Sequence, residues 1–335
     1  MEKNHLIRKQ TTIFILWIAF MATNMICLAS DNADTTSSSG ATADSIQHWK
    51  FAGQTALHFN QISLNNWSSG GESSLAGKAS SRLLLSYDKD NISFDSKLNM
   101  MFGLIGLEES GLQKTDDKID LSSNYSLKAF KDWSYSTFLN LKTQFAEGYK
   151  YPNDSTVISD FFAPGYITLS LGMKYKPSDE LLILLSPASG KFTFVYNQEL
   201  ANKGSFGVKP AVVDDSTGAI LEEGKNYKAE FGINLVFSVE KEVIKNIKAE
   251  SKLNLYNNYL DDNLPNRWNI DLDWESNITF AVNEHIETDL YIHMIYDHET
   301  KIPQYEMVDG EKVKVGEGPR LQFKESFGLG LAFKF

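Results

Sequence analysis

The stretch that decides the fold is Tyr227-Lys-Ala-Glu-Phe-Gly-Ile-Asn-Leu-Val-Phe-Ser-Val239, in which every second side chain is apolar or aromatic. Successive side chains of a β-strand point to opposite faces, so this segment has one apolar face and one mostly polar face. The stretch from Trp268 to Phe280 largely repeats the pattern. Strands of soluble proteins usually run for about five or six residues. These segments alternate over the length that a tilted strand needs to cross a bilayer, about ten residues.

The same alternation predicts an all-β fold, a transmembrane antiparallel up-and-down β-barrel of about twelve strands. The strands are expected at 49–61, 75–88, 91–106, 118–130, 133–148, 165–176, 179–187, 226–239, 246–258, 266–281, 285–298 and 319–335. The connections alternate between short and long, which is typical of barrels with short periplasmic turns and long outer loops. The segment from Lys191 to Tyr196 also has the composition of a strand. We assign it to the long outer loop 188–225, because a thirteenth spanning strand would break the alternation.

The N-terminus predicts export. Basic residues precede an apolar run from Ile13 to Ala22, and small residues follow as far as Ala29, which is the pattern of a cleaved signal peptide. We therefore divide the chain into a signal peptide (1–29), a flexible periplasmic leader rich in Ser, Thr, Asp and Ala (30–48), and an outer-membrane barrel (49–335). An uncleaved anchor helix is the alternative for the first segment, and Asn24 and the short apolar run argue against it.

Composition excludes several classes of function. The only cysteine is Cys27, within the predicted signal peptide, so the exported chain has no thiol for catalysis, disulfides or metal binding. The formal net charge is -11 and no basic patch with interleaved aromatics occurs, which argues against a nucleic-acid partner. No HExxH motif or glycine-rich phosphate loop is present. We therefore predict no enzyme activity, no metal and no cofactor. A lipid hydrolase is the remote alternative, and its one plausible general base is His298, beside Asp297.

Aromatic residues near the ends of the predicted strands resemble the girdles of outer-membrane barrels. They are Trp49, Tyr87, Trp133, Tyr149, Tyr166, Tyr175, Trp268 and Tyr296. The chain ends on an alternating apolar strand that resembles the signal read by the barrel-assembly machinery, with Phe327, Leu329, Leu331, Phe333 and Phe335 on one face. We expect the protein in the outer membrane of a Gram-negative bacterium, with outer-membrane lipid and the barrel-assembly machinery as partners and a monomer as the default.

Five motifs spread over most of the exported chain share a pattern with a known family. They are Phe59-Asn-Gln61-Ile-Ser-Leu-Asn-Asn-Trp67-Ser-Ser-Gly70-Gly71-Glu72, Lys131-Asp132-Trp133-Ser-Tyr135, Thr143-Gln144-Phe145, Phe162-Ala-Pro164-Gly165-Tyr166 and Lys174-Tyr175-Lys176-Pro177. With them the chain resembles an uncharacterised outer-membrane β-barrel family of Bacteroides-group bacteria, described only as a domain of unknown function. The resemblance implies location and fold. It implies no substrate and no catalytic residue.

Charged residues on the polar faces of the strands fall into two groups that should line the lumen. The basic group is Arg82, Lys97, Lys128 and Lys142, and the acidic group is Asp271, Asp273, Glu275, Glu287 and Asp289. In a barrel of twelve strands these groups lie on roughly opposite walls. They either face each other across an open lumen, where their field would select polar or zwitterionic solutes, or meet as ion pairs that plug it.

The sequence therefore favours a narrow pore or solute channel of unknown substrate. The alternative is a closed structural or surface-binding barrel without transport. Barrels of eight strands are filled by side chains and those of sixteen enclose an aqueous channel, so a barrel of about twelve strands permits both. The glycine-containing loop 188–225 either folds inward as a constriction or outward as a binding surface.

Overall fold

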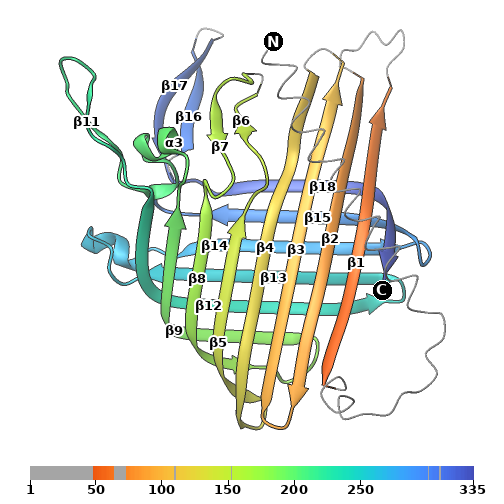
Figure 1. The fold of residues 1–335 in the computed structure, drawn as a ribbon. Helices are drawn as coiled ribbons and strands as arrows, with labels where there is room; N and C mark the ends of the chain where they lie inside the picture. Colours follow the sequence, from red (N-terminus) through yellow and green to blue (C-terminus); the bar gives the residue numbers. More distant parts are fainter. Residues whose placement is uncertain (1–47, 64–72, 109–110, 152, 301, 309–310) are drawn as a thin grey trace, which may run out of the picture.

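The computed structural model describes residues 48–335 apart from 64–72, 109–110, 152, 301 and 309–310. The predicted signal peptide and residues 30–47 of the predicted leader lie outside the described residues. Within the described residues, twelve strands form a closed antiparallel barrel. Each of these strands pairs with the barrel strands before and after it in the chain, and the first pairs with the last. The predicted fold class is confirmed. Figure 1 shows β1 to β4 running up the front wall and β12 to β15 crossing behind them.

The barrel strands follow the predicted order. They are β1 (Trp49–Ile62), β2 (Ser74–Lys89), β3 (Ile92–Leu107), β4 (Gly111–Phe130), β5 (Trp133–Thr143), β8 (Gly165–Tyr175), β9 (Leu181–Phe194), β12 (Tyr227–Ile244), β13 (Ile247–Asn258), β14 (Asp271–Ala281), β15 (Ile286–Tyr296) and β18 (Gln322–Lys334). One end of the barrel, named here the turn end, carries the short connections, Trp49 and the C-terminal Phe335. Asp90 and Asn246 adopt the left-handed conformation that a tight hairpin requires, with φ of 54° and 69°. The opposite end is named the loop end.

Five predicted strands have a boundary that is wrong by five residues or more. The strands expected at 133–148 and 266–281 are Trp133–Thr143 and Asp271–Ala281, and the strand expected at 226–239 continues to Ile244. The strand expected at 179–187 continues to Phe194, so Lys191 belongs to the barrel wall rather than to the loop. The pairing of β9 shifts register beside Pro187 on both flanking strands. Proline cannot donate to the ladder, and a bulge lets the strand pass this residue and continue. The strand expected at 118–130 begins at Gly111, which shortens the preceding loop.

The long connections carry short elements of their own. These are the hairpins of β6 (Gly148–Tyr149) with β7 (Val157–Ser159), β10 (Val212–Val213) with β11 (Ile220–Glu222) and β16 (Ile302–Val308) with β17 (Glu311–Gly318), and the helical turns α3 (Gln198–Asn202), η1 (Ser205–Gly207) and η2 (Leu264–Trp268). Two of the loops share a small apolar core at the loop end, formed by Ala163, Val195, Leu200, Ala201 and Val208. No helix among the described residues is long and apolar enough to cross a membrane.

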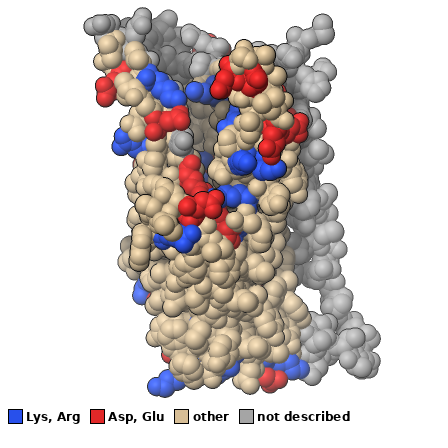
Figure 2. All heavy atoms as spheres, turned by 90° about the vertical axis from the view of Figure 1, so that its left-hand side faces the viewer, with Lys and Arg blue, Asp and Glu red and all other residues tan. Residues whose placement is uncertain are grey.

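The outer surface of the barrel is apolar. Large hydrophobic side chains are exposed on strands all around it, among them Phe51, Leu75, Leu127, Leu139, Leu169, Leu185, Phe231, Trp274, Phe323 and Leu329. Soluble monomers rarely expose contiguous apolar patches of more than a few hundred Å². Figure 2 shows one side of the molecule, where charged side chains gather over the upper part and around a hollow, above a broad zone with almost no charge.

Part of the predicted aromatic girdle is present at the turn end. The rings of Trp49 and Tyr87 lie 4.8 Å apart, and those of Trp133 and Tyr175 lie 4.7 Å apart. Two members of the predicted set are wrong. Tyr149 is buried in a loop, where its hydroxyl donates to Glu147. Tyr166 pairs in register with Lys142, so its side chain points to the lumen.

Placing a charge in the apolar belt should destabilise the barrel according to depth. Leu169 lies near the middle of β8 and is 48% exposed. We expect Leu169→Arg to lower the free energy of unfolding in lipid vesicles by about 2–4 kcal/mol, and Val243→Arg at the turn end to lower it by about 0–1 kcal/mol. Denaturant titration read by heat-modifiable gel migration measures both. Equal losses of unfolding free energy in the two variants would contradict a membrane belt centred near Leu169.

Candidate functional site

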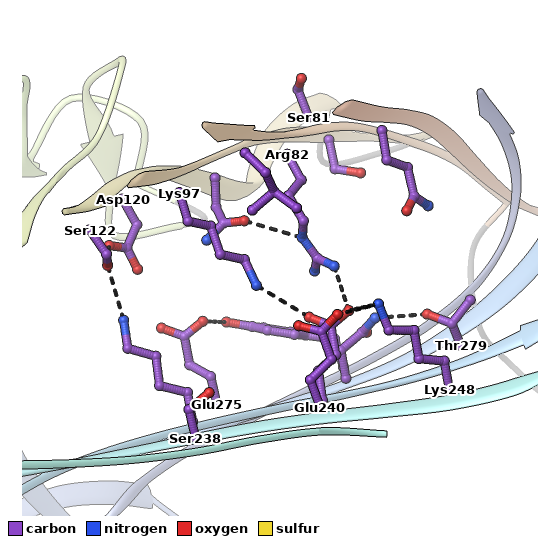
Figure 3. A pocket seen from close by; sticks show the side chains of 18 of the residues that line it. Ser81, Arg82, Lys97, Asp120, Ser122, Ser238, Glu240, Lys248, Glu275 and Thr279 are labelled. Atoms are coloured by element: carbon purple, nitrogen blue, oxygen red, sulfur yellow. Dashed lines mark hydrogen bonds and ion pairs between the residues drawn. The ribbon is translucent and has the colours of Figure 1, made fainter. Parts of the chain in front are cut away.

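The lumen is crossed by ion pairs between opposite walls. Arg82 of β2 and Lys97 of β3 both approach Glu250 of β13, at 2.5 and 3.5 Å. Figure 3 shows the side chains of Arg82 and Lys97 pointing from one wall toward the other wall, which carries Glu240 and Lys248. Lys248 also lies 3.2 Å from Glu250. In the ring of strands β3 and β13 are six places apart, so the pairing joins the two sides of the barrel.

A second layer of charges lies closer to the loop end. Lys118 of β4 pairs with Glu275 of β14, and the ammonium of Lys142 lies 2.5 Å from Asp273. Asp120 is 2% exposed and sits between the two lysines, at 3.5 Å from Lys118 and 4.0 Å from Lys142. Burying a charge is costly unless it is paired and hydrogen-bonded, and this layer satisfies that condition.

A third layer lies nearest the loop end. Lys191 approaches Asp271 at 3.0 Å and Glu230 at 3.8 Å, and its ammonium lies 5.0 Å from the centre of the Tyr256 ring. Lys228 lies 3.3 Å from Glu230 and also pairs with Glu299 in the loop after β15. Burial raises the pKa of the Glu299 carboxyl, and the Lys228 ammonium opposes this effect. Each of the three layers therefore contains both basic and acidic side chains.

A cavity of about 890 Å³ occupies the turn-end part of the lumen. It reaches from Leu182 and Phe335 at the turn end to Lys118 and Glu275 in the second layer. One side of its wall is apolar, because Phe138, Leu184 and Val236 pack together there. The described residues that line it include none from the loop 188–225. The cavity is therefore amphipathic, with an apolar patch on one wall and ion pairs on others.

The structure places most of the predicted lumen residues inside the barrel and brings the two groups together. Arg82, Lys97, Lys142, Asp271, Asp273 and Glu275 take part in the three layers. Glu287 and Asp289 lie on β15 beside His58 of β1. Lys128 is exposed near the turn end and, among the described residues, belongs to none of the layers.

Sequence reasoning missed Glu250, the partner of both Arg82 and Lys97. The signal was present, because Lys248, Glu250 and Lys252 occupy one face of β13. Lys191 was missed because its segment was assigned to a loop. The predicted assembly-signal residues lie on β18 or at its end, and Phe327, Leu329, Leu331 and Phe335 are exposed there, with Phe333 half-buried.

Comparison with known proteins finds one family of unknown function and several membrane β-barrels of low similarity. A model of the family described as "Protein of unknown function (DUF3078)" matches residues 59–149, which include the first three of the five motifs quoted above. A search of curated proteins finds no match. The chain is similar in structure to the COG4313 outer membrane channel from Pseudomonas putida F1, with 10% identity, 90% of this chain and 100% of that chain covered, and a TM-score of 0.37.

Two further solved structures show a comparable likeness. The NanC porin has 9% identity, with 84% of this chain and 100% of that chain covered and a TM-score of 0.34. The translocator domain of autotransporter NalP from Neisseria meningitidis has 12% identity, with 95% of this chain and 96% of that chain covered and a TM-score of 0.30. At these identities the likeness concerns the barrel fold alone.

Removing one charged partner from the second layer should lower the free energy of unfolding of the barrel. Lys142→Met leaves the carboxylates of Asp273 and Glu275 short of one cation, and we expect a loss of roughly 3–5 kcal/mol in the free energy of unfolding. The double variant Lys142→Met with Asp273→Asn should lose less than the sum of the single losses. Lys128→Met is the matched control and should change stability by about 0.5 kcal/mol or less. Additive losses in the double variant would show that the pair is not coupled.

Proposed function

We propose that this protein is an outer-membrane β-barrel of a Gram-negative bacterium that conducts small polar solutes through a narrow lumen. The observation that carries the proposal is the junction of the amphipathic cavity, about 890 Å³, with the layers of ion pairs contributed by opposite walls. Paired charges along a passage favour solutes that exchange hydrogen bonds and charges with them, and disfavour apolar solutes. The expected substrate class is therefore small zwitterionic or polar molecules.

The proposed location rests on the barrel exterior. A closed barrel leaves no sheet edge unpaired, which a bilayer demands, and its apolar outer face matches lipid. The outward apolar residues of β18 supply the proposed contact with the barrel-assembly machinery. The Bacteroides-group origin suggested by the sequence motifs and the monomeric state are part of the proposal.

Ion pairs that bridge the lumen also support a second candidate, a closed structural or surface-binding barrel. In that case the layers act as a permanent plug, and the outer loops carry the function. The two candidates differ in a measurable property, since only a channel passes current. We further propose that the protein is not a lipid hydrolase. Release of fatty acid from phospholipid by the folded barrel, lost in His298→Ala, would overturn that proposal.

Conductance of the folded barrel in a planar bilayer tests the channel. We expect discrete current steps, and we expect the double variant Asp273→Asn with Glu275→Gln to shift selectivity toward anions, because Asp120 is then the one carboxylate left, among the described residues, within ion-pair distance of Lys118 and Lys142. Glu222→Gln with Glu223→Gln, in the loop at the β10–β11 hairpin, is the control and should leave selectivity unchanged.

Two results would contradict the proposal, the first by excluding a channel and the second by excluding the second layer of charges from the path of the ions. A heat-modifiable, folded barrel that passes no current would favour the closed barrel. Current with the same selectivity in the wild type and in the Asp273→Asn, Glu275→Gln variant would show that ions do not pass the second layer of charges.

A further inference from the structure

Three side chains with metal-binding atoms meet where the barrel closes. His58 lies on β1 and Glu287 on β15, the two strands that flank β18, and both pair in register with Gly330 of β18. Asp289 pairs with Gly328, two residues along. Because Gly330 has no side chain, the imidazole of His58 can reach across β18 toward β15. A Cβ atom at position 330 would lie 2.5 Å from Cδ2 of His58.

The cluster is compact and buried. One donor atom from each of His58, Glu287 and Asp289 lies within 4.8 Å of the others, and Nε2 of His58 is 2.7 Å from Oδ2 of Asp289. His58 is 5% exposed and Glu287 is 2% exposed. Nδ1 of His58 is buried and has no hydrogen-bond partner in the described part of the chain. The internal hydrogen bonds of the cluster therefore leave the imidazole incompletely satisfied.

Neighbouring side chains hold each carboxylate by one oxygen. Gln54 donates to Oε1 of Glu287 at 2.8 Å, and Thr279 donates to Oδ1 of Asp289 at 2.5 Å. The second oxygen of Asp289 thus faces the imidazole, and the second oxygen of Glu287 lies 3.8 Å from the ammonium of Lys334. Groups that orient ligands in this way are a regular feature of metal sites.

We propose that His58, Glu287 and Asp289 form a binding site for a divalent first-row transition-metal ion such as Zn²⁺. One imidazole nitrogen with two carboxylates is a donor set that suits these ions. All three residues line the lumen cavity, so a further coordination position would face the cavity and admit water or a solute. Binding would replace the proton shared by His58 and Asp289 with the metal ion. This site goes beyond the proposed channel and does not depend on it.

A second cluster in the lumen has the same donors but a different electrostatic setting. Asp273, Glu275 and His293 also lie within 4.8 Å of one another. The ammonium of Lys142 lies 2.5 Å from Asp273, and Lys118 pairs with Glu275. These two cations already neutralise the carboxylates and would repel a dication. In the His58 cluster the one lysine within ion-pair distance of a carboxylate, among the described residues, is the half-exposed Lys334 at 3.8 Å from Glu287. Lys78 pairs in register with His58, but its ammonium lies 3.4 Å from the hydroxyl of Ser326. The His58 cluster is therefore the better site, and the other serves as an internal control.

Titration of the folded full-length barrel in detergent with Co²⁺, followed by d–d absorption and competed with Zn²⁺, tests the proposal. We expect one Co²⁺ per barrel. Glu287→Gln and Asp289→Asn should each weaken binding by about 100-fold or more, since loss of a ligand should cost at least as much as loss of a group that orients one. His293→Asn, in the second cluster, should leave the affinity unchanged. Heat-modifiable migration verifies that each variant is folded.

Glycine substitutions separate the geometry of the site from its donors. Gly330→Ala keeps all three ligands but displaces the imidazole, and we expect Co²⁺ binding to weaken by roughly 10-fold. Gly328→Ala is the matched control, because its Cβ would lie 3.6 Å from Cβ of His58, an ordinary contact. The proposal fails if the folded wild type binds no Co²⁺, if Glu287→Gln binds as the wild type does, or if His293→Asn abolishes binding. None of these readouts involves current, so their failure leaves the channel proposal standing.

Discussion

Closure of the sheet between β1 and β18 is the constraint on which the rest of the structure depends. A bilayer offers no water to unpaired backbone groups, so a spanning sheet must have no edge. β1 pairs with β18 from Gln54 to Phe59, and the terminal Phe335 adds reciprocal backbone hydrogen bonds with Gly53 at 2.8 and 2.9 Å. Once the sheet is closed, the alternating faces of every strand have fixed environments. Apolar side chains lie on the outside, where the proposed location places lipid, and charged side chains of the other face must find partners inside.

The width of the barrel determines how those charges find partners. With twelve strands the walls are close enough for long side chains to reach across. Arg82 and Lys97 from one wall share Glu250 of the other, and Lys142 reaches Asp273. The same contacts stabilise buried charges and narrow the lumen. A wider barrel would leave these charges hydrated, and a narrower one would leave no cavity beside them.

The sequence predicts well whatever depends on the two-residue period. The order of the strands, the side to which their charges point and the short turns all follow from alternation and turn residues such as Asp90 and Asn246. It does not predict which charges meet, because contacts across the lumen depend on the stagger between strands that are distant in the chain. Alternation places Glu250 in the lumen, but it does not show that Glu250 is the partner of Arg82 and Lys97. The prediction also fails after Pro187. The segment from Lys191 was assigned to the loop because a thirteenth strand would break the alternation of connections, whereas a bulge beside Pro187 lets β9 itself continue to Phe194.

The final strand shows that both faces of an alternating segment carry information. On one face Leu329 and Leu331, which belong to the predicted assembly signal, are exposed. On the other face Gly330 pairs with strands on both sides, and Gly328 pairs with Asp289 of β15. In a closed sheet, an inward glycine leaves a gap through which side chains two strands apart can meet. The cluster of Asp273, Glu275 and His293 needs no such gap, because β14 and β15 are adjacent. The position of Gly330 therefore accounts for the place where His58 and Glu287 come together.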